Sequence, residues 1–396
     1  MFLLIGGGIL KSQIKFIALG GGQQVGASCY YLNIDGCNIL LDCGRGISEA
    51  ITYGPNFNTV VEAGYIESIT DIDAVLISHS HYDHIGYLPE FHCMAPNVPI
   101  YATSQTKALA YHQIWDNGKK YDANENVTKR IRNEILAENS LNSITAANYA
   151  KKIKLPKFDV TFLEAGHIPG AAMILIETKN RKILYTGDFS KNETPLAKGY
   201  RLPENIDADV LIMCGLHAMN PEHLYNYGID NIVNRLRTCL SQNDSVVLRI
   251  HQLTKGLEIT KMLGDAMENG VILEQKIFVD DDIWQLAERL EVMSVFSLNR
   301  HCRRFPEVDF ESGIYITESN ILNGYFNTVD VDFSLHATYP ELKELIRRVQ
   351  PKTALVVHVG KRDKFSNNHI MEMDIQDETL ENITFLYPKN NEIYCV

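Results

Sequence analysis

The chain has 396 residues, of which 45% are hydrophobic and 22% charged, so it can bury a full core and is long enough for two domains. Its 37 basic and 49 acidic residues give a net charge of -12, which excludes a global basic field for nucleic acid but not a local basic groove. The eight cysteines are scattered without a C-x-x-C pair, which argues against a cysteine zinc finger and favours a reducing, cytoplasmic setting.

The N-terminal segment MFLLIGGGIL is apolar but lacks a basic start and a small-residue cleavage site. We expect an edge strand or lead-in here, with a signal peptide as the alternative. No apolar run approaches the roughly 20 residues that a membrane-spanning helix needs. The sequence therefore predicts a soluble protein without a membrane partner.

Short apolar runs punctuated by glycine turns predict strands over the first 80 residues: KFIAL, SCYYLNI, NILLDCG and DIDAVLISH. Residues 104–152 carry a helical pattern. Strands then return as FDVTFLEA, AMILIET and RKILYTGDFS. This alternation favours an α/β protein over an all-β barrel.

From about residue 209, strand and helix patterns alternate as ADVLIM, NIVNRLRTCL, DSVVLRI, GLEITKMLGDAM and KIFVDD. This alternation of strands and helices predicts a doubly wound unit. The chain closes with a helix at YPELKELIRRV, a strand at TALVVH and an expected terminal hairpin near ITFLYPKNNEIYCV.

Two short segments are basic against the acidic background. Residues 119–157 carry nine Lys or Arg and four Asp or Glu, and RHCRRF covers residues 300–305. Each segment alone is typical of a solvated surface. Together they could flank an anionic substrate.

Metal-capable side chains follow five of the predicted strands. In α/β proteins, ligands and catalytic groups gather at the carboxyl ends of strands. Imidazole nitrogens and carboxylate oxygens are suitable zinc ligands without any thiolate. The residues are Asp42, His79, His81, Asp83, His84, His167, Asp188 and His358.

The loop HSHYDHIG (79–86) compresses four of these residues into six positions. His79 and His81 alternate and can point to one side of an extended segment, and a turn could aim Asp83 and His84 at a second ion. Two ions ~4 Å apart can activate a bridging hydroxide for hydrolysis, and Asp188 is the candidate shared ligand. The remaining isolated histidines are interpreted as structural: His92, His112, His223, His301 and His369.

These motifs resemble the metallo-β-lactamase superfamily. HSHYDHIG is similar to its signature loop, and LLDCG, EAGHIPGAAMILIE and YTGDFS to its further aspartate and histidine motifs. The longer segment LGGGQQVGASCYYLNIDGCNILLDCG more specifically resembles the β-CASP branch. The tail FSLHATYPELKELIRRVQPKTALVVHVGK resembles the last two histidine motifs, here His336 and His358.

The resemblance implies an αββα sandwich of residues 1–216 and 334–396, with an inserted α/β, β-CASP-like domain over 217–333. It implies one zinc on His79, His81 and His167, and another on Asp83, His84 and His358. Asp188 would bridge the two ions. Manganese and iron are alternative metals. Asp42 would support the site from behind, and His336 would be the general acid for the leaving oxygen.

The chain departs from the family pattern in the inserted domain. Cys214 stands where a carboxylate would orient His336, and a thiol cannot hold an imidazolium as a carboxylate does. His217 is a candidate replacement acid. Lys255 matches a family arginine and is the candidate substrate-binding residue, while His251 stands at an aromatic position. The inserted domain is also shortened.

Three functions stay open. The first is a two-zinc phosphodiesterase that cleaves RNA, single-stranded by expectation, and less readily DNA. The second is the same chemistry on a small phosphodiester, a cyclic nucleotide or a thioester, which the shortened insertion favours. The third is a non-catalytic subunit of a nucleic-acid-processing assembly. A homodimer or a partner subunit that completes the substrate groove is expected with the first.

Overall fold

The computed structural model describes residues 14–48, 51–121, 127–219, 229–241, 245–293, 297, 302–306, 309–320, 322, 324–331, 333–359 and 380–396. The edge strand or lead-in expected at the N-terminus lies outside these residues. Within them, no helix is both long and apolar enough to cross a membrane.

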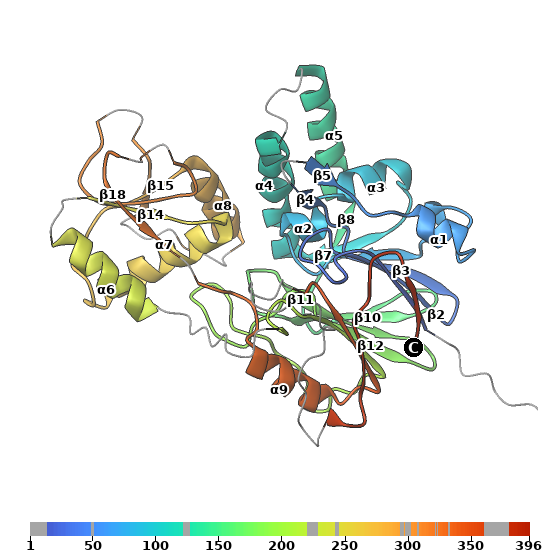
Figure 1. Ribbon diagram of the computed structural model, residues 1–396. Coiled ribbons are helices and arrows are strands. Elements are labelled where there is room, and N and C mark those ends of the chain that lie inside the picture. The colour runs from blue at the N-terminus through green and yellow to red at the C-terminus, as the bar shows by residue number, and fades with distance from the viewer. Residues whose placement is uncertain are drawn as a thin grey trace, which may run out of the picture.

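The first of two large sheets has the strand order β21-β1-β2-β3-β6-β7-β8 (Figure 1). Side chains alternate along its strands, so that Phe16 and Ala18 face the second sheet while Ile17 and Leu19 face the outer helices. The strands are β1 Lys15–Gly20, β2 Cys29–Ile34, β3 Cys37–Leu41, β6 Ala74–Leu76, β7 Ile100–Thr103, β8 Ile144–Ala147 and β21 Ile393–Cys395. The outer helices are α1 Asn58–Glu62, α3 Leu88–Met94, α4 Ser104–Tyr121 and α5 Val127–Ser143.

The second large sheet has the order β20-β19-β13-β12-β11-β10-β9. Its outer face is covered by α9 (Tyr339–Val349), which begins at a capping box of Thr338 and Glu341. Its strands are β9 Lys152–Lys154, β10 Asp159–Glu164, β11 Ala172–Glu177, β12 Lys182–Tyr185, β13 Val210–Cys214, β19 Thr353–Val357 and β20 Thr384–Leu386. The layers thus run helices, sheet, sheet, helix, which confirms the αββα sandwich.

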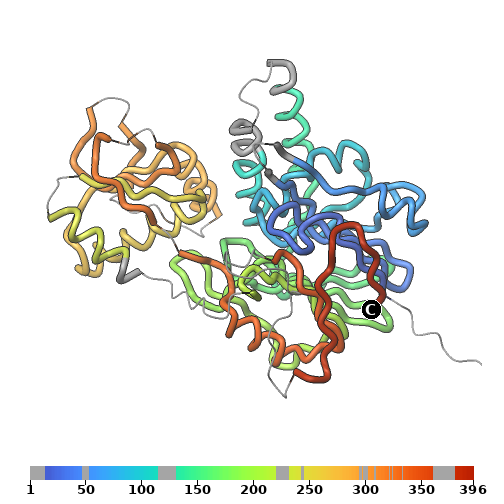
Figure 2. Tube along the Cα trace, viewed as in Figure 1, coloured from blue at the N-terminus to red at the C-terminus, as the bar shows by residue number. Residues whose placement is uncertain are grey.

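A third sheet forms a separate lobe beside the sandwich, as the tube in Figure 2 shows. Its order is β16-β15-β17-β14-β18, and all of its pairs are parallel. We call this part, from α6 to β18, the inserted lobe. Its elements are α6 Ile229–Leu240, β14 Val246–Arg249, α7 Leu253–Glu268, β15 Ile277–Val279, α8 Asp281–Val292, β16 Cys302–Arg304, β17 Ile314–Thr317 and β18 Asn327–Asp330.

The prediction of a doubly wound unit from residue 209 is wrong in two respects. The first strand, β13, pairs with β12 and β19 in the sandwich rather than with the inserted lobe. The buried residues of α6, α7 and α8 also join one cluster on a single face of the third sheet. Going from β14 to β15 to β16, the chain advances in one direction across the sheet. Right-handed crossovers in one direction place both connecting helices, α7 and α8, on the same face.

Two further predictions of local structure are wrong. The helical pattern was expected to reach residue 152, but residues 144–147 form an edge strand of the first sheet, and Lys152 begins β9, an edge strand of the second. The expected terminal hairpin does not form, because β20 pairs with β19 and β21 pairs with β1 in the other sheet. The remaining elements are the hairpin β4 Gly46–Ser48 and β5 Ile51–Tyr53, a 3-10 turn at Ile69–Asp71 and the one-turn helix α2 Tyr82–Ile85.

The inserted lobe is docked on the sandwich through polar as well as apolar contacts. On α8, the Arg289 guanidinium donates from Nε to His112 Nε2 at 3.0 Å and lies over the Tyr111 ring of α4. On α7, the fully buried Glu258 accepts from Thr194 Oγ1 of the sandwich at 2.7 Å. These contacts fix the orientation of α7 toward the edge of the sandwich.

Candidate metal centre

Every metal-capable residue singled out in the sequence lies at or just beyond the end of a sandwich strand. Asp42 follows β3, the histidine loop follows β6, and the other residues follow β10, β12 and β19. The structure gathers all of them except Asp42 into two adjoining groups, in each of which the ligand atoms lie within 4.8 Å of one another. These are His79, His81, His167 and Asp188, and Asp83, His84 and His358.

The histidine loop is extended as far as His81 and then makes the single helical turn α2. The turn packs against the residues just before β2 and just after β3: Ser28 N donates to Asp83 O at 2.7 Å, and Cys43 N donates to His84 O at 2.8 Å. A Cβ on Gly44 would lie 1.8 Å from the Asp83 carbonyl oxygen, so only glycine permits this approach. The local sequence thereby brings Asp83 and His84 beside a second ligand group.

In the first group, three imidazole nitrogens converge. His81 Nδ1 lies 3.1 Å from both His79 Nε2 and His167 Nε2. Each ring's other nitrogen faces a hydroxyl or carbonyl oxygen, which favours the proton on that outer side. Three lone pairs then face one another, an unfavourable arrangement unless a cation lies among them, so these residues fit a metal ion.

Asp188 connects the two groups. Its Oδ2 atom lies 3.7 Å from His79 Nε2, 3.8 Å from His167 Nε2 and 3.4 Å from His84 Nε2. Its Oδ1 atom is buried without a hydrogen-bond partner among the described residues. A carboxylate with one oxygen between the groups and a second oxygen free is suited to bridging two cations.

Burial determines the charge state of the first group. It is the main cause that holds the pKa values of His79 and His81 well below the usual range and lowers that of His167, with further lowering from neighbouring imidazoles. Neutral imidazole is the form that binds metal. The group is therefore ready to bind a cation at neutral pH.

The charges around Asp188 have the opposite balance. Burial alone would raise the pKa of Asp188, but electrostatic interactions with the His358, His84 and His336 rings hold it well below the usual range. Burial alone would lower the pKa of His84, yet Asp188 and Asp83 raise it well above its usual value. Asp188 is thus a carboxylate at neutral pH.

The sequence did not reveal the residues that hold the ligands from behind. Asp42, itself expected behind the site, accepts from Ser78 N (2.6 Å), Ser78 Oγ (2.7 Å) and Tyr185 OH (2.5 Å), and its Oδ2 lies 2.7 Å from His84 Nδ1. Ser28 Oγ lies 3.0 Å from His358 Nδ1. Ser78 is adjacent to the histidine loop and Tyr185 begins the motif YTGDFS, so proximity to these motifs could have suggested both hydroxyls.

His336 lies beside Asp188, with its Nδ1 atom 3.6 Å from Oδ2. Among the described residues this nitrogen has no hydrogen-bond partner, and burial holds the pKa of the ring well below its usual range. Cys214 joins this pair within 4.8 Å. Burial raises the pKa of the Cys214 thiol well above its usual value, so it supplies no negative charge to His336. His217 Nε2 lies 3.1 Å from Ser334 Oγ, which accepts from the backbone N–H of His336.

Lys255 lies on the first turn of α7, half-buried, with its ammonium 5.3 Å from the centre of the Phe333 ring. It is close enough to His81 to contribute to the lowered pKa of that ring. His251 is exposed. Of the histidines interpreted as structural, His112 accepts from Arg289, whereas His223, His301 and His369 lie outside the described residues.

Three of the described cations of the two basic segments are engaged in ion pairs. Lys152 pairs with Glu177 at 2.5 Å and Lys157 with Asp73 at 2.9 Å, both on the sandwich. Arg304 lies within 3.7 Å of Asp281. These pairs favour the interpretation as solvated surface.

Two family models match the chain. A metallo-β-lactamase superfamily domain covers residues 31–206, which contain both histidine motifs and Asp188. A Zn-dependent metallo-hydrolase RNA specificity domain covers residues 326–365, which contain His336 and His358.

Among solved structures, a protein of unknown function from Enterococcus faecalis matches 97% of this chain and 100% of its own, with a TM-score of 0.62 and 14% identity. At that identity the likeness concerns the fold alone.

Among curated proteins, the chain is similar to a probable ribonuclease, RNase MJ4, from Methanocaldococcus jannaschii, with 31% identity over 64% of this chain and 57% of the relative. It is 26% identical to ribonuclease TTHA0252 from Thermus thermophilus over 63% of this chain and 54% of that one. Cleavage and polyadenylation specificity factor subunit 3 from Dictyostelium discoideum is 30% identical over 57% of this chain and 30% of its own length. The chain thus spans about half the length, or less, of the curated relatives it matches. The motifs, the layered sheets and these matches agree: the chain belongs to the metallo-β-lactamase superfamily, in its β-CASP branch.

Proposed function

We propose that this chain is a dinuclear zinc hydrolase that cleaves phosphodiester bonds of single-stranded RNA. The observation that carries the proposal is the convergence of three imidazole nitrogens beside an Asp188 oxygen that also faces the second group. One ion would be held by His79, His81 and His167, the other by Asp83, His84 and His358, with Asp188 shared. Manganese and iron suit the same ligands.

When bound, the two metal ions would stabilise negative charge on the phosphate and lower the pKa of a water molecule to ~7. Asp83 is the most exposed of the proposed ligands, at 31%, so its carboxylate is accessible to that water. Asp42 keeps His84 oriented. His336 would hold a proton on Nδ1 for the leaving oxygen, and Lys255 would contact a substrate phosphate.

RNA is the proposed substrate because the model that matches residues 326–365 is named for RNA specificity and two of the relatives are named as ribonucleases. The inserted β-CASP-like domain, proposed to span residues 217–333, would cover the cleft. A partner subunit that completes the groove is also proposed, since other relatives are named as subunits of larger assemblies, among them Integrator complex subunit 11. None of the eight cysteines, all of them among the described residues, forms a disulfide, which supports the proposed cytoplasmic location.

The first test combines metal analysis with a substrate panel. Wild-type protein should contain two ions per chain and cleave labelled RNA. Asp188→Ala should lose metal and lower kcat/KM by roughly 100-fold or more. Asp207→Ala, an exposed carboxylate between β12 and β13, is the matched control and should behave as wild type.

The panel also includes single-stranded DNA, bis-p-nitrophenyl phosphate, cyclic nucleotides and a thioester. Hydrolysis of a small substrate without cleavage of RNA would contradict the proposed substrate. Two bound ions without any hydrolysis would favour the non-catalytic subunit. His336→Ala addresses the proton donor separately: an unchanged rate would mean that this role was lost along with the carboxylate that Cys214 replaces.

A further inference from the structure

The outward-facing nitrogens of the first ligand group are held from different parts of the molecule. His79 Nδ1 lies 3.0 Å from Ser78 Oγ, next to it in the sandwich. His81 Nε2 lies 3.1 Å from Thr254 Oγ1, on the first turn of α7 in the inserted lobe. His167 Nδ1 lies 2.9 Å from the Leu335 carbonyl oxygen, on the segment that returns from the inserted lobe to the sandwich.

The contact between Thr254 and His81 is sealed from solvent. Thr254 is 1% exposed and His81 is 6% exposed. Donation from His81 Nε2 to the hydroxyl would fix both the ring plane and the proton position, and would leave Nδ1 as the lone pair that faces His79 and His167. An outer partner of this kind orients a metal-binding histidine and raises its basicity.

The second ligand group has no such dependence among the described residues. His84 Nδ1 lies against Asp42 and His358 Nδ1 against Ser28, and both partners belong to the sandwich. The two proposed metal positions therefore differ. One is braced by the sandwich alone, the other also by the inserted lobe.

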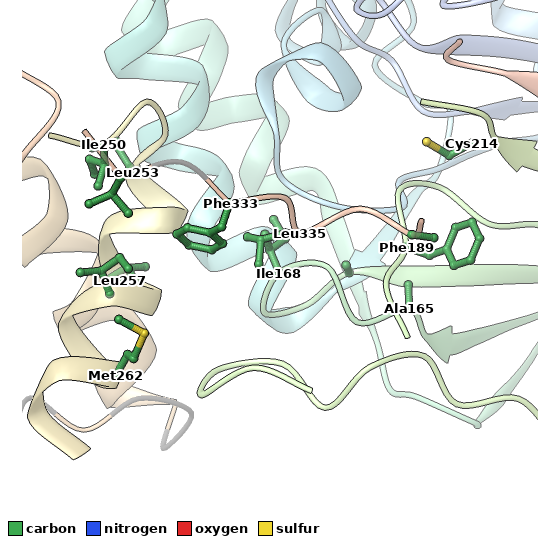
Figure 3. Packing of buried hydrophobic residues seen from close by; sticks show 14 of the residues in the cluster. Ala165, Ile168, Phe189, Cys214, Ile250, Leu253, Leu257, Met262, Phe333 and Leu335 are labelled. Atoms are coloured by element: carbon green, nitrogen blue, oxygen red, sulfur yellow. The ribbon is translucent and has the colours of Figure 1, made fainter. Parts of the chain in front are cut away.

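The position of Thr254 depends on how α7 is seated. Figure 3 shows Leu253 and Leu257 of α7 beside Phe333, with Leu335 and Ile168 continuing the apolar contact into the sandwich. Glu258, one turn further along α7, accepts from Thr194 of the sandwich. A shift of the inserted lobe would therefore move Thr254 away from His81.

We propose that Thr254 is a positioning residue for His81, and that metal binding at the first position and docking of the inserted lobe are thermodynamically linked. The inference rests on the metal centre proposed above. Linkage is reciprocal, so a docked lobe tightens metal binding and bound metal tightens docking by the same factor.

The test measures stepwise zinc affinities of the full chain by competition with a chromophoric chelator. Thr254→Val keeps the shape and removes the hydroxyl, and should raise the Kd of one of the two ions by roughly 10- to 100-fold. Thr254→Ser keeps the hydroxyl, and its Kd for that ion should remain within about threefold of wild type. Ser28→Ala should weaken the other ion instead.

Thr260→Val is the matched control. It makes the same change to a buried threonine of α7 whose hydroxyl donates to the Gly256 carbonyl at 2.7 Å, within the helix. Both affinities should be unchanged. An equal loss in Thr254→Val and Thr260→Val, or wild-type affinities in Thr254→Val, would overturn the inference. Wild-type protein that takes up no zinc would instead contradict the metal centre itself.

A second readout tests the reciprocal effect without any activity. Added zinc should slow amide hydrogen exchange in α7 of the wild type by a larger factor than in α9, which contributes no such contact to a ligand histidine among the described residues. This excess protection should disappear in Thr254→Val. Equal protection of α7 in the two proteins would contradict the linkage.

Discussion

Three site residues have a backbone conformation that residues other than glycine rarely adopt. Asp42, His167 and His358 have φ angles of 58°, 59° and 52°. Such positions cost about 1–3 kcal/mol each and persist where surrounding contacts enforce them. All three side chains have a buried polar contact, which holds them in place. The left-handed residues turn the chain out of the sheets and into the site.

Asp42→Asn tests how much the centre depends on this buried carboxylate. Its amide group would face donors that Asp42 now accepts from, including Ser78 and Tyr185. The unfolding free energy of the metal-free chain should fall by about 3 kcal/mol, measured by urea denaturation. Asp35→Asn, whose carboxylate accepts from Thr178 just after the end of β11, should cost under about 1 kcal/mol on the same scale. Equal stability of Asp42→Asn and wild type would contradict this account.

The proposed ligands could be predicted because H-x-H-x-D-H places four of them in six residues and the others follow apolar strands. Two of the residues that hold the ligand histidines from behind could not be predicted. Thr254 and Ser28 are hydroxyl residues in or near apolar runs, where a hydroxyl has many structural uses. Only the tertiary structure brings Thr254 to His81 and Ser28 to His358.

At the scale of elements, hydrophobic periodicity predicted most strands and helices but not their partners. The terminal strands β20 and β21 flank a turn sequence and were expected to pair with each other. Each instead extends an edge of a different sheet. Short strands carry little register information, and free edges distant in sequence decide where they pair.

Arg289 offers an element-scale test of docking, since it joins α8 to α4 without touching the site. Arg289→Ala should loosen the inserted lobe and raise the Kd of the ion sensitive to Thr254 by about 2- to 30-fold, because coupling through contacts of this kind carries about 0.5–2 kcal/mol. Chelator competition measures this change.

Arg304→Ala is the control for the Arg289 experiment. Arg304 contacts Glu288, Asp281 and the Trp284 ring, all within the inserted lobe. The substitution should leave both zinc affinities unchanged. If Arg289→Ala matched this control, docking through α8 would not influence the centre.

At the scale of the whole molecule, removing the metal should lower stability because the proposed ligands tie both sheets together. Each ion at 100 times its Kd contributes about 2.7 kcal/mol. Chelation should therefore lower the thermal unfolding midpoint of wild type by several degrees, and zinc should restore it. Asp188→Ala should respond far less to either treatment. An identical response in both proteins would place the stabilising metal elsewhere.

The interrupted sandwich has a consequence for the order in which the molecule is assembled. In the second sheet, β13 pairs with both β12 and β19, and the whole inserted lobe lies between β13 and β19 in the chain. During synthesis, His79 through Asp188 leave the ribosome before Thr254, Leu335 and His358 do. The three histidines of the first group can meet early, but without the two outer braces. Until β19 arrives, β13 has an open edge and the second group lacks a member. A nascent chain thus lacks part of the metal centre. The two ligand groups and their supporting contacts are complete only after the inserted lobe and β19 have been synthesised.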